Sequence, residues 1–225
     1  MKRFSILIII IAVVQTTAVA QSAKDNRRWQ FGAMAGPNWT IYVPKSAGYD
    51  AMPGFLAGAD IGYRFRNSPK GWSLRLQPYF LMSRSSTEIG TRESGTYSKT
   101  RSKNRTINLP LLVRYTFTGG KVRPFAEIGA VWNVRNRWLF KGTYCNTDEC
   151  YDIGGDWQSV ENKDRRFSAL ASAGVEVDIG KVTIPITVRV TQLLKKKETF
   201  YEPFSGTDIT IPTIRTIQVT AGITF

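Results

Sequence analysis

Nine charged side chains lie inside stretches where apolar and polar residues alternate, and they comprise five arginines and four acids. No lysine occupies such a mid-strand position. Arginine presents a planar fork that binds carboxylates through two hydrogen bonds, which suits an enclosed site where charges must pair. The sequence therefore predicts an internal charge network made of Asp60, Arg64, Arg75, Arg114, Arg123, Glu127, Glu176, Asp178 and Arg189.

The two cysteines and the absence of histidine limit the remaining chemistry. Without histidine, Ser-His-Asp hydrolysis, Cys-His proteolysis and histidine-ligated zinc are excluded. Cys145 and Cys150 lie in the polar segment GTYCNTDECYD. An oxidising compartment would join them in a loop disulfide, and two free thiols are the alternative. We predict no catalytic residue, no metal site and no cofactor, and we expect that the protein is not an enzyme.

The first 20 residues match a secretory signal. Lys2 and Arg3 precede an apolar run, and Ala18 and Ala20 form an A-x-A site that predicts cleavage before residue 21. We expect a cleaved signal peptide at 1–20, a short lead at 21–28 and one domain at 29–225.

Composition alone would fit a soluble basic protein. The 225 residues carry a formal charge of +14, with a mean hydropathy of -0.21. That charge leaves nucleic-acid binding open, but export and the mid-strand position of the arginines argue against it.

Eight segments alternate with the period of a β-strand, and no segment shows a sustained helical period. The last is the clearest, with apolar residues at every second position from Ile217 to Phe225. The sequence predicts an all-β chain with strands near 29–36, 55–65, 72–82, 107–117, 122–135, 167–179, 182–191 and 216–225.

The connections between these segments also alternate, between short and long. Short turns fall near 67–71, 118–121 and 180–181, and long polar loops near 40–54, 84–106, 137–166 and 195–212. An outer-membrane barrel has this layout, with all short turns at one end. Nine residues at about 3.3 Å each, tilted about 40°, rise roughly 23 Å, close to the ~25 Å apolar band. We predict an eight-stranded antiparallel up-and-down transmembrane β-barrel.

A soluble lipocalin-like barrel would place the apolar face inward instead. Three features favour an apolar face that contacts lipid. The charged residues of the polar face are arginines and acids without lysine, and that face has many glycines. Aromatic residues lie near both ends of the apolar face. In this arrangement Arg135 continues the inward face of its strand. Eight strands leave room only for side chains, so the charge network would fill the interior; a pore or binding pocket is the alternative.

Pro78 and Pro185 lie in mid-strand and predict local bulges.

One predicted outer loop is strongly basic. Between residues 84 and 105 it has six basic residues and two acids, a net charge of +4. Charge-assisted bonds from such a loop could reach the phosphates of lipid A, and a merely solvated loop is the alternative. The basic residues are Arg84, Arg92, Lys99, Arg101, Lys103 and Arg105.

The order of these motifs resembles the porin-like or PorT-like family of outer-membrane β-barrels from Gram-negative bacteria. The resemblance covers about 29–225 and rests on the segments FGAMAGPNWT, GFLAGADIGYRF, LRLQPYFLMS, INLPLLVRYTF, RPFAEIGAVW, ALASAGVEVDIG and QVTAGITF. It implies that the C-terminal segment with Phe225, Ile223 and Ala221 is the signal read by the barrel-assembly machinery. The barrel enzymes of similar architecture depend on a histidine, which this chain lacks.

These observations leave two main functional hypotheses. The first is a monomeric structural or interaction barrel in the cell outer membrane, with a filled charged interior, whose long loops contact lipopolysaccharide or an extracellular ligand. The second is a small pore or transporter, or a secretion-system accessory barrel.

Overall fold

The computed structural model describes residues 28–43, 51–91, 96–145, 149–162, 166–194, 199–202, 207–210 and 213–225. The predicted signal peptide and residues 21–27 of the lead lie outside this part. In the described residues, no helix has the length and apolar character needed to cross a membrane.

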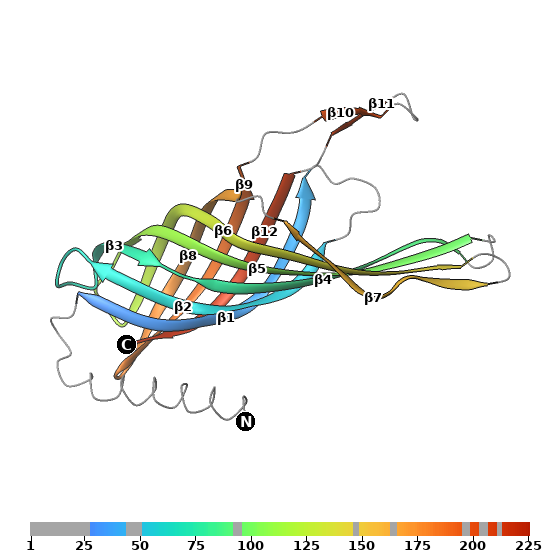
Figure 1. The fold of residues 1–225 in the computed structure, drawn as a ribbon. Coiled ribbons are helices and arrows are strands. Elements are labelled where there is room, and N and C mark those ends of the chain that lie inside the picture. The colour runs from blue at the N-terminus through green and yellow to red at the C-terminus, as the bar shows by residue number, and fades with distance from the viewer. Residues whose placement is uncertain are drawn as a thin grey trace.

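Eight strand positions close into a ring, in which every neighbouring pair is antiparallel (Figure 1). The first and last strands pair, with Ala33 opposite Ile223, and so close the barrel. The prediction of an eight-stranded antiparallel barrel is confirmed. The strands of the ring are β1 (Trp29–Val43), β2 (Met52–Arg64), β3 (Gly71–Leu76) with β4 (Tyr79–Thr91), β5 (Thr96–Thr116), β6 (Val122–Cys145), β8 (Arg166–Ile179), β9 (Val182–Leu193) and β12 (Thr213–Thr224).

The apolar faces of the ring point outward. Ile128 is 68% exposed and Trp72 is 56% exposed, although both are large apolar side chains. The polar face is buried: Arg75, which alternates with Leu74 and Leu76 on β3, is 1% exposed. A soluble barrel would have the reverse orientation, so the predicted orientation is the one observed.

Aromatic side chains meet on the outer surface near both ends of the barrel. At the end with the short turns, the rings of Trp29 and Tyr63 are 5.1 Å apart, and those of Trp72 and Tyr115 are 4.8 Å apart. At the other end Trp132 stacks on Phe167 at 6.4 Å. Such belts are typical of the two interfaces of a bilayer.

The two mid-strand prolines behave differently. At Pro78 the predicted strand 72–82 divides into β3 and β4, because proline cannot donate to the ladder. Pro185 has no such effect, since β9 keeps one register with β12 on both sides of it: Ile186 is opposite Ala221 and Thr183 is opposite Thr224. The register is also unchanged across Pro78, where Leu76 is opposite Leu111 and Tyr79 is opposite Asn108. The predicted bulges at Pro78 and Pro185 are therefore both wrong.

Three ring strands, β4, β5 and β6, continue far beyond the ring and with β7 form an extension, defined here as the sheet β4–β5–β6–β7 beyond residues 83, 106 and 134 (Figure 1). β7 (Cys150–Asn162) pairs only with β6 in this sheet. β6 has 24 residues, which at about 3.3 Å each is more than twice the length needed to cross a bilayer. The prediction of loops at 84–106 and 137–166 is wrong for most of these residues, because backbone ladders hold them as strands although their sequence lacks a regular alternation of apolar and polar residues.

The other two long connections were also predicted as loops. β1 and β2 extend into the first, as far as Val43 and from Met52, and residues 44–50 lie outside the described part. The connection before β12 contains a small hairpin of β10 (Thr199–Glu202) and β11 (Thr207–Thr210).

A β-bulge interrupts the pairing of β5 and β6 where the extension begins. Asn108 is opposite Asn133, but Ile107 is opposite Arg135, so Val134 has no partner in the register. Because side chains alternate with a period of two, one extra residue exchanges the faces of all that follows. Arg135 therefore points outward beside Ile107 and is exposed, whereas the uninterrupted pattern predicted it inside.

Candidate functional site

The predicted charge network lies inside the barrel and begins at Arg75 on β3. Its guanidinium donates to the Asp60 carboxylate at 3.1 Å and to the Glu176 carboxylate at 3.0 Å. Asp60 comes from β2 and Glu176 from β8, so this one side chain joins strands on different sides of the ring. Gly62 makes room for it, since a Cβ atom there would lie 2.8 Å from Nη1 of Arg75.

Arg114 on β5 is the centre of the network. Its Nε donates to the Glu127 carboxylate at 2.7 Å, its Nη1 pairs with Glu176, and its guanidinium lies 3.9 Å from the centre of the Phe125 ring. The side chain is 1% exposed. Buried charge is tolerated only where pairing and hydrogen bonds compensate its lost hydration, and both carboxylates do so here.

The network continues toward the short turns through Arg123. This residue reaches the other oxygen of Glu176 at 3.2 Å and also pairs with Asp178, whose Oδ1 accepts from Nη2 at 2.7 Å. Arg189 on β9 lies 4.0 Å from Glu127. These ion pairs join eight of the nine predicted residues, and Arg64, the ninth, is half-buried at the end of β2.

Apolar side chains fill other parts of the interior, and the sequence reasoning assigned them no role. They form two buried clusters on the face otherwise occupied by polar residues, consistent with a filled interior. Their signal in the sequence is weak, because each is a single apolar residue on a polar face. The clusters are Met34, Leu56, Tyr79 and Leu81, and Leu112, Val131 and Leu170.

The ion pairs of the charge network connect strands across the barrel, and its side chains do not form a metal site. In the part of the chain that the structure describes, no three or more His, Cys, Asp or Glu side chains are grouped to hold a metal ion. Each carboxylate of the network is held by at least one arginine.

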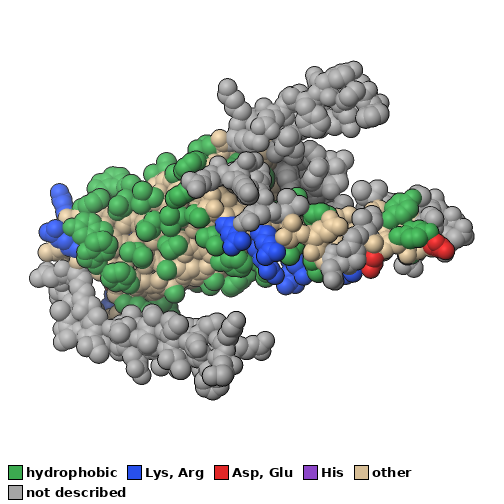
Figure 2. All heavy atoms as spheres, viewed as in Figure 1, with side chains coloured by type: hydrophobic (Ala, Val, Ile, Leu, Met, Phe, Trp, Pro, Cys, Tyr) green, Lys and Arg blue, Asp and Glu red, His purple; other side chains and the backbone are tan. Residues whose placement is uncertain are grey.

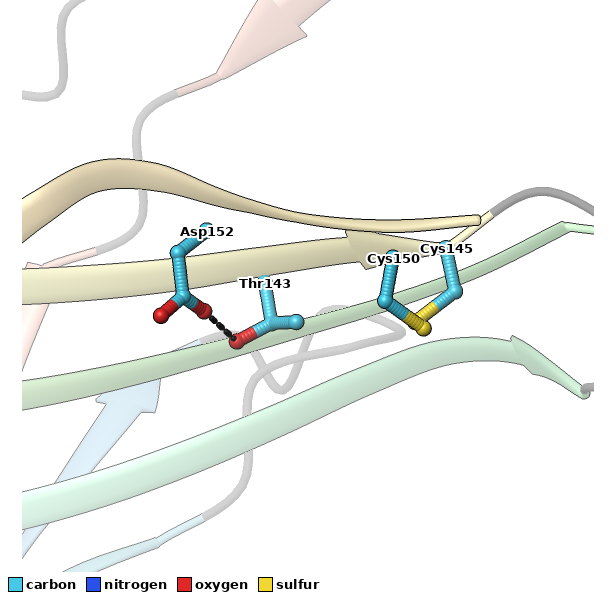
Figure 3. The surroundings of a disulfide bond; sticks show 4 residues. All are labelled: Thr143, Cys145, Cys150 and Asp152. Carbon is cyan, nitrogen blue, oxygen red and sulfur yellow. Dashed lines mark hydrogen bonds between the residues drawn. A yellow bond between two sulfur atoms is a disulfide. The ribbon is translucent and has the colours of Figure 1, made fainter. Parts of the chain in front are cut away.

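The far end of the extension carries a disulfide (Figure 3). Cys145 ends β6 and Cys150 begins β7; the two are directly opposite, with Cα atoms 3.9 Å apart. The predicted disulfide is thus present, and it closes a tight β6–β7 hairpin. Two residues back along the hairpin, the Thr143 hydroxyl donates to the Asp152 carboxylate at 3.0 Å. This hydrogen bond, followed by the nearby Lys141 ammonium at 3.3 Å, lowers the pKa of Asp152.

The residues predicted as a basic outer loop lie on strands. Arg84 is on β4, and Lys99, Arg101, Lys103 and Arg105 are at alternate positions of β5, so the four share one face. Arg84 is directly opposite Lys103. Arg92 lies outside the described residues.

The C-terminal segment closes the barrel. The backbone N–H of Phe225 donates to the Phe31 carbonyl at 2.8 Å, which extends the β1–β12 ladder to the last residue. Ile223 is exposed on the outer surface, and Ala221 is paired with Ala35.

Comparisons with known proteins agree with this architecture. A family model described as outer membrane protein beta-barrel domain matches residues 19–194. Among solved structures, Neisserial surface protein A is similar at 15% identity over 88% of this chain and 96% of that chain, with a TM-score of 0.45. The attachment invasion locus protein of Yersinia pestis has 13% identity over 88% and 100%, with a TM-score of 0.44.

The outer membrane protease OmpT from Escherichia coli is also similar, at 8% identity over 90% of this chain and 97% of that chain, with a TM-score of 0.31. No curated protein matches the sequence.

Proposed function

Because the chain belongs to the family of outer membrane protein β-barrel domains, we propose that it is a closed barrel with a structural or interaction role. In this proposal the ring anchors the protein in the outer membrane after a signal peptide at 1–20 is cleaved. The extension then contacts lipopolysaccharide or an extracellular ligand. The protein acts as a monomer, and nucleic acid is not a partner.

The observation that carries this proposal is the cross-barrel ion pairing at Glu176. Its carboxylate receives Arg75 from β3, Arg114 from β5 and Arg123 from β6, and it is 4% exposed itself. Side chains that reach from three strands to one carboxylate occupy the space that an eight-stranded pore would need.

The absence of histidine supports a role other than catalysis. The OmpT protease shares the architecture at low identity, but histidine-dependent hydrolysis has no base in this chain. A fold shared with an enzyme does not transfer its activity, since activity depends on the residues of the site.

The C-terminal segment supports the expected route of assembly. We propose that Phe225, Ile223 and Ala221 are recognised by the barrel-assembly machinery. Their position in the strand that closes the ring is consistent with a segment needed before closure.

Two measurements test the proposal. Membrane fractionation with heat-modifiable gel migration should place a folded barrel in the outer membrane. In planar bilayers the purified protein should show no single-channel conductance, whereas a porin used as the positive control conducts under the same conditions.

Discrete conductance steps that disappear when Arg114 is replaced by a larger apolar side chain would instead support the alternative, a small pore or transporter. A role as a secretion-system accessory barrel would require a partner protein retained in gentle purification.

A further inference from the structure

We propose that one face of the extension binds the phosphate groups of lipopolysaccharide in the outer leaflet beside the barrel. This inference rests on the proposed outer-membrane location and names the partner of the extension. The surface, called here the basic face, combines three strands. Its basic residues are Arg84 on β4, Lys99, Arg101, Lys103 and Arg105 on β5, and Arg135, Arg137 and Lys141 on β6.

Charge is segregated between the two faces of the extension. Among the residues of β4, β5 and β6 whose side chains the structure describes, every charged one beyond the ring shares a face with the basic residues above, and Asp152 of β7 does too. The opposite face has only uncharged positions, such as Ser102, Asn104, Trp138 and Tyr144. Water reaches both faces of a free sheet, so solubility alone would not place all charges on one of them.

The bulge at Val134 creates this segregation. Before it, the inward residues of β6 have odd numbers, from Arg123 to Asn133; after it, odd numbers lie outward. If Val134 were paired with Ile107 in a regular ladder, Arg137 and Lys141 would lie on the opposite face, away from the β5 cations. A single unpaired residue thus assembles one basic surface from two separate sequence segments.

Like charges stand directly opposite each other on this face. Arg105 is opposite Arg137, Arg101 is opposite Lys141, and Arg84 is opposite Lys103. Directly opposed side chains have Cβ atoms about 4.5–5.5 Å apart, and like charges at that separation destabilise a sheet. Anionic groups between them would remove the repulsion, and arginine binds phosphate through two parallel hydrogen bonds.

The position of the basic face selects a lipid as the source of phosphate. Arg105 lies two residues before Ile107 on the same face of β5, about 7 Å along the strand toward the extension. Ile107 and its neighbour Phe80 are exposed on the apolar outer surface of the barrel. In Figure 2 the blue side chains gather where the green surface of the barrel ends and the extension begins. Phosphates of lipid A lie at this level, where the acyl chains of the same molecule can pack against the barrel.

Several cations of the basic face already contact other residues of the protein, and this helps to assign the phosphate contacts to particular side chains. Lys141 pairs with Asp152 at 3.3 Å, Arg137 donates to the Ser159 hydroxyl at 3.2 Å, and Lys103 lies 3.8 Å from the centre of the Trp157 ring. Arg84, Arg101 and Arg105 are exposed. We assign the phosphate contacts chiefly to these three and to Arg137, and the distal Lys141 to the fold of the extension.

The test compares two triple variants of the folded protein in zwitterionic detergent, titrated with purified lipopolysaccharide. The face variant is Arg101→Gln/Arg105→Gln/Arg137→Gln. The matched control is Arg66→Gln/Lys70→Gln/Lys121→Gln, which removes three exposed charges at the short-turn end. We expect the face variant to bind about tenfold more weakly or worse, and the control to stay within about twofold of the wild type. Equal loss in both variants would show attraction by net charge only and overturn the proposal.

Three ligands identify the bound group. Intact lipopolysaccharide should bind more tightly than the same molecule with its lipid A phosphates removed, and more tightly than phosphatidylglycerol micelles. Equal binding of the dephosphorylated form would overturn the proposal, as would full competition by millimolar inorganic phosphate, which would indicate a site for the free anion.

Inserting one serine between Asn136 and Arg137 provides an independent test at unchanged charge. The insertion displaces the following residues of β6 by one position against β5, so it should move Arg137 and Lys141 to the opposite face and weaken lipopolysaccharide binding although every basic residue remains. Heat-modifiable migration and outer-membrane fractionation are measured for each variant. If the face variant or the insertion variant folds in the outer membrane yet binds as the wild type, the basic face is refuted while the proposed barrel stays intact. If the insertion prevents folding, the triple variants decide.

Discussion

Arginine occurs both in the barrel interior and on the extension, but in opposite surroundings. Inside, Arg114 has two carboxylates and an aromatic ring around it and is almost inaccessible to solvent. On the extension, Arg105 is exposed and stands opposite another arginine. The charges around Arg114 therefore compensate one another, whereas those of the extension gather with the same sign.

The contrast predicts that substitutions in the two regions affect different properties, stability in the interior and binding on the extension. Removing one partner of a buried ion pair leaves an uncompensated charge in a medium of low dielectric constant, which is costly. An exposed charge is solvated whether or not it has a partner, and its loss costs little. The interior should therefore control whether the barrel folds, and the extension should control what it contacts.

The largest effect is expected from Arg114→Met. The substitution leaves Glu127 without its closest cation, so we expect a loss of about 3–5 kcal/mol in the free energy of unfolding. Urea denaturation of the barrel in detergent, followed by heat-modifiable migration, measures this loss. Arg101→Met is the matched control on the extension, with an expected change of less than about 0.5 kcal/mol. Similar losses in both variants would remove the distinction between the two regions.

Replacing the whole ion-paired group sharpens the same comparison. Arg114→Leu/Glu127→Leu/Arg189→Leu removes Glu127 together with both arginines that pair with it, so part of the stability lost in the single variant should return. A triple variant less stable than Arg114→Met would show that these charges are needed for more than mutual compensation.

The second prediction concerns the disulfide, which should act on the extension alone. Cys145→Ser/Cys150→Ser opens a loop with a sequence separation of 5, and the loop-closure model gives about 2 kcal/mol of lost local stability for so short a loop. We expect faster proteolysis within 137–162 with an unchanged urea midpoint for the barrel. A lowered barrel midpoint would show that the two regions fold as one unit.

The sequence predicted the ring well because half-burial leaves a period of two. The segments at 182–191 and 216–225 alternate without interruption, and they are strands in the structure. The inward placement of Arg75, Arg114 and Glu176 followed from the same alternation. The eight ion-paired residues could therefore be listed in advance, although their individual partners could not, because these depend on the tilt and stagger of the strands.

The extension was missed because neither of its faces is buried. From Ser98 to Thr106 both alternating sets are polar, so the hydrophobic period that identifies a strand is absent. The bulge beside Val134 has no proline or glycine to mark it. Consequently Arg135 was assigned to the wrong face, and Arg137 and Lys141 were not grouped with the basic residues of β5.

The smallest expected effect tests whether charges on the extension depend on local hydrogen bonds. The pKa of Asp152 is lowered first by the Thr143 hydroxyl and then by Lys141. A lowered pKa in the folded state means that the interaction is fully present above the usual value of 3.8 and is lost as the pH falls through the lowered pKa. Carboxyl-carbon NMR titration should therefore show a higher pKa of Asp152 in Thr143→Val than in the wild type, and a rise in Lys141→Gln as well. The carboxylate is exposed and lies on the extension, so neither variant should change the urea midpoint of the barrel. A larger rise in Lys141→Gln would mean that the ion pair dominates, and charge on the extension would then resemble charge in the interior.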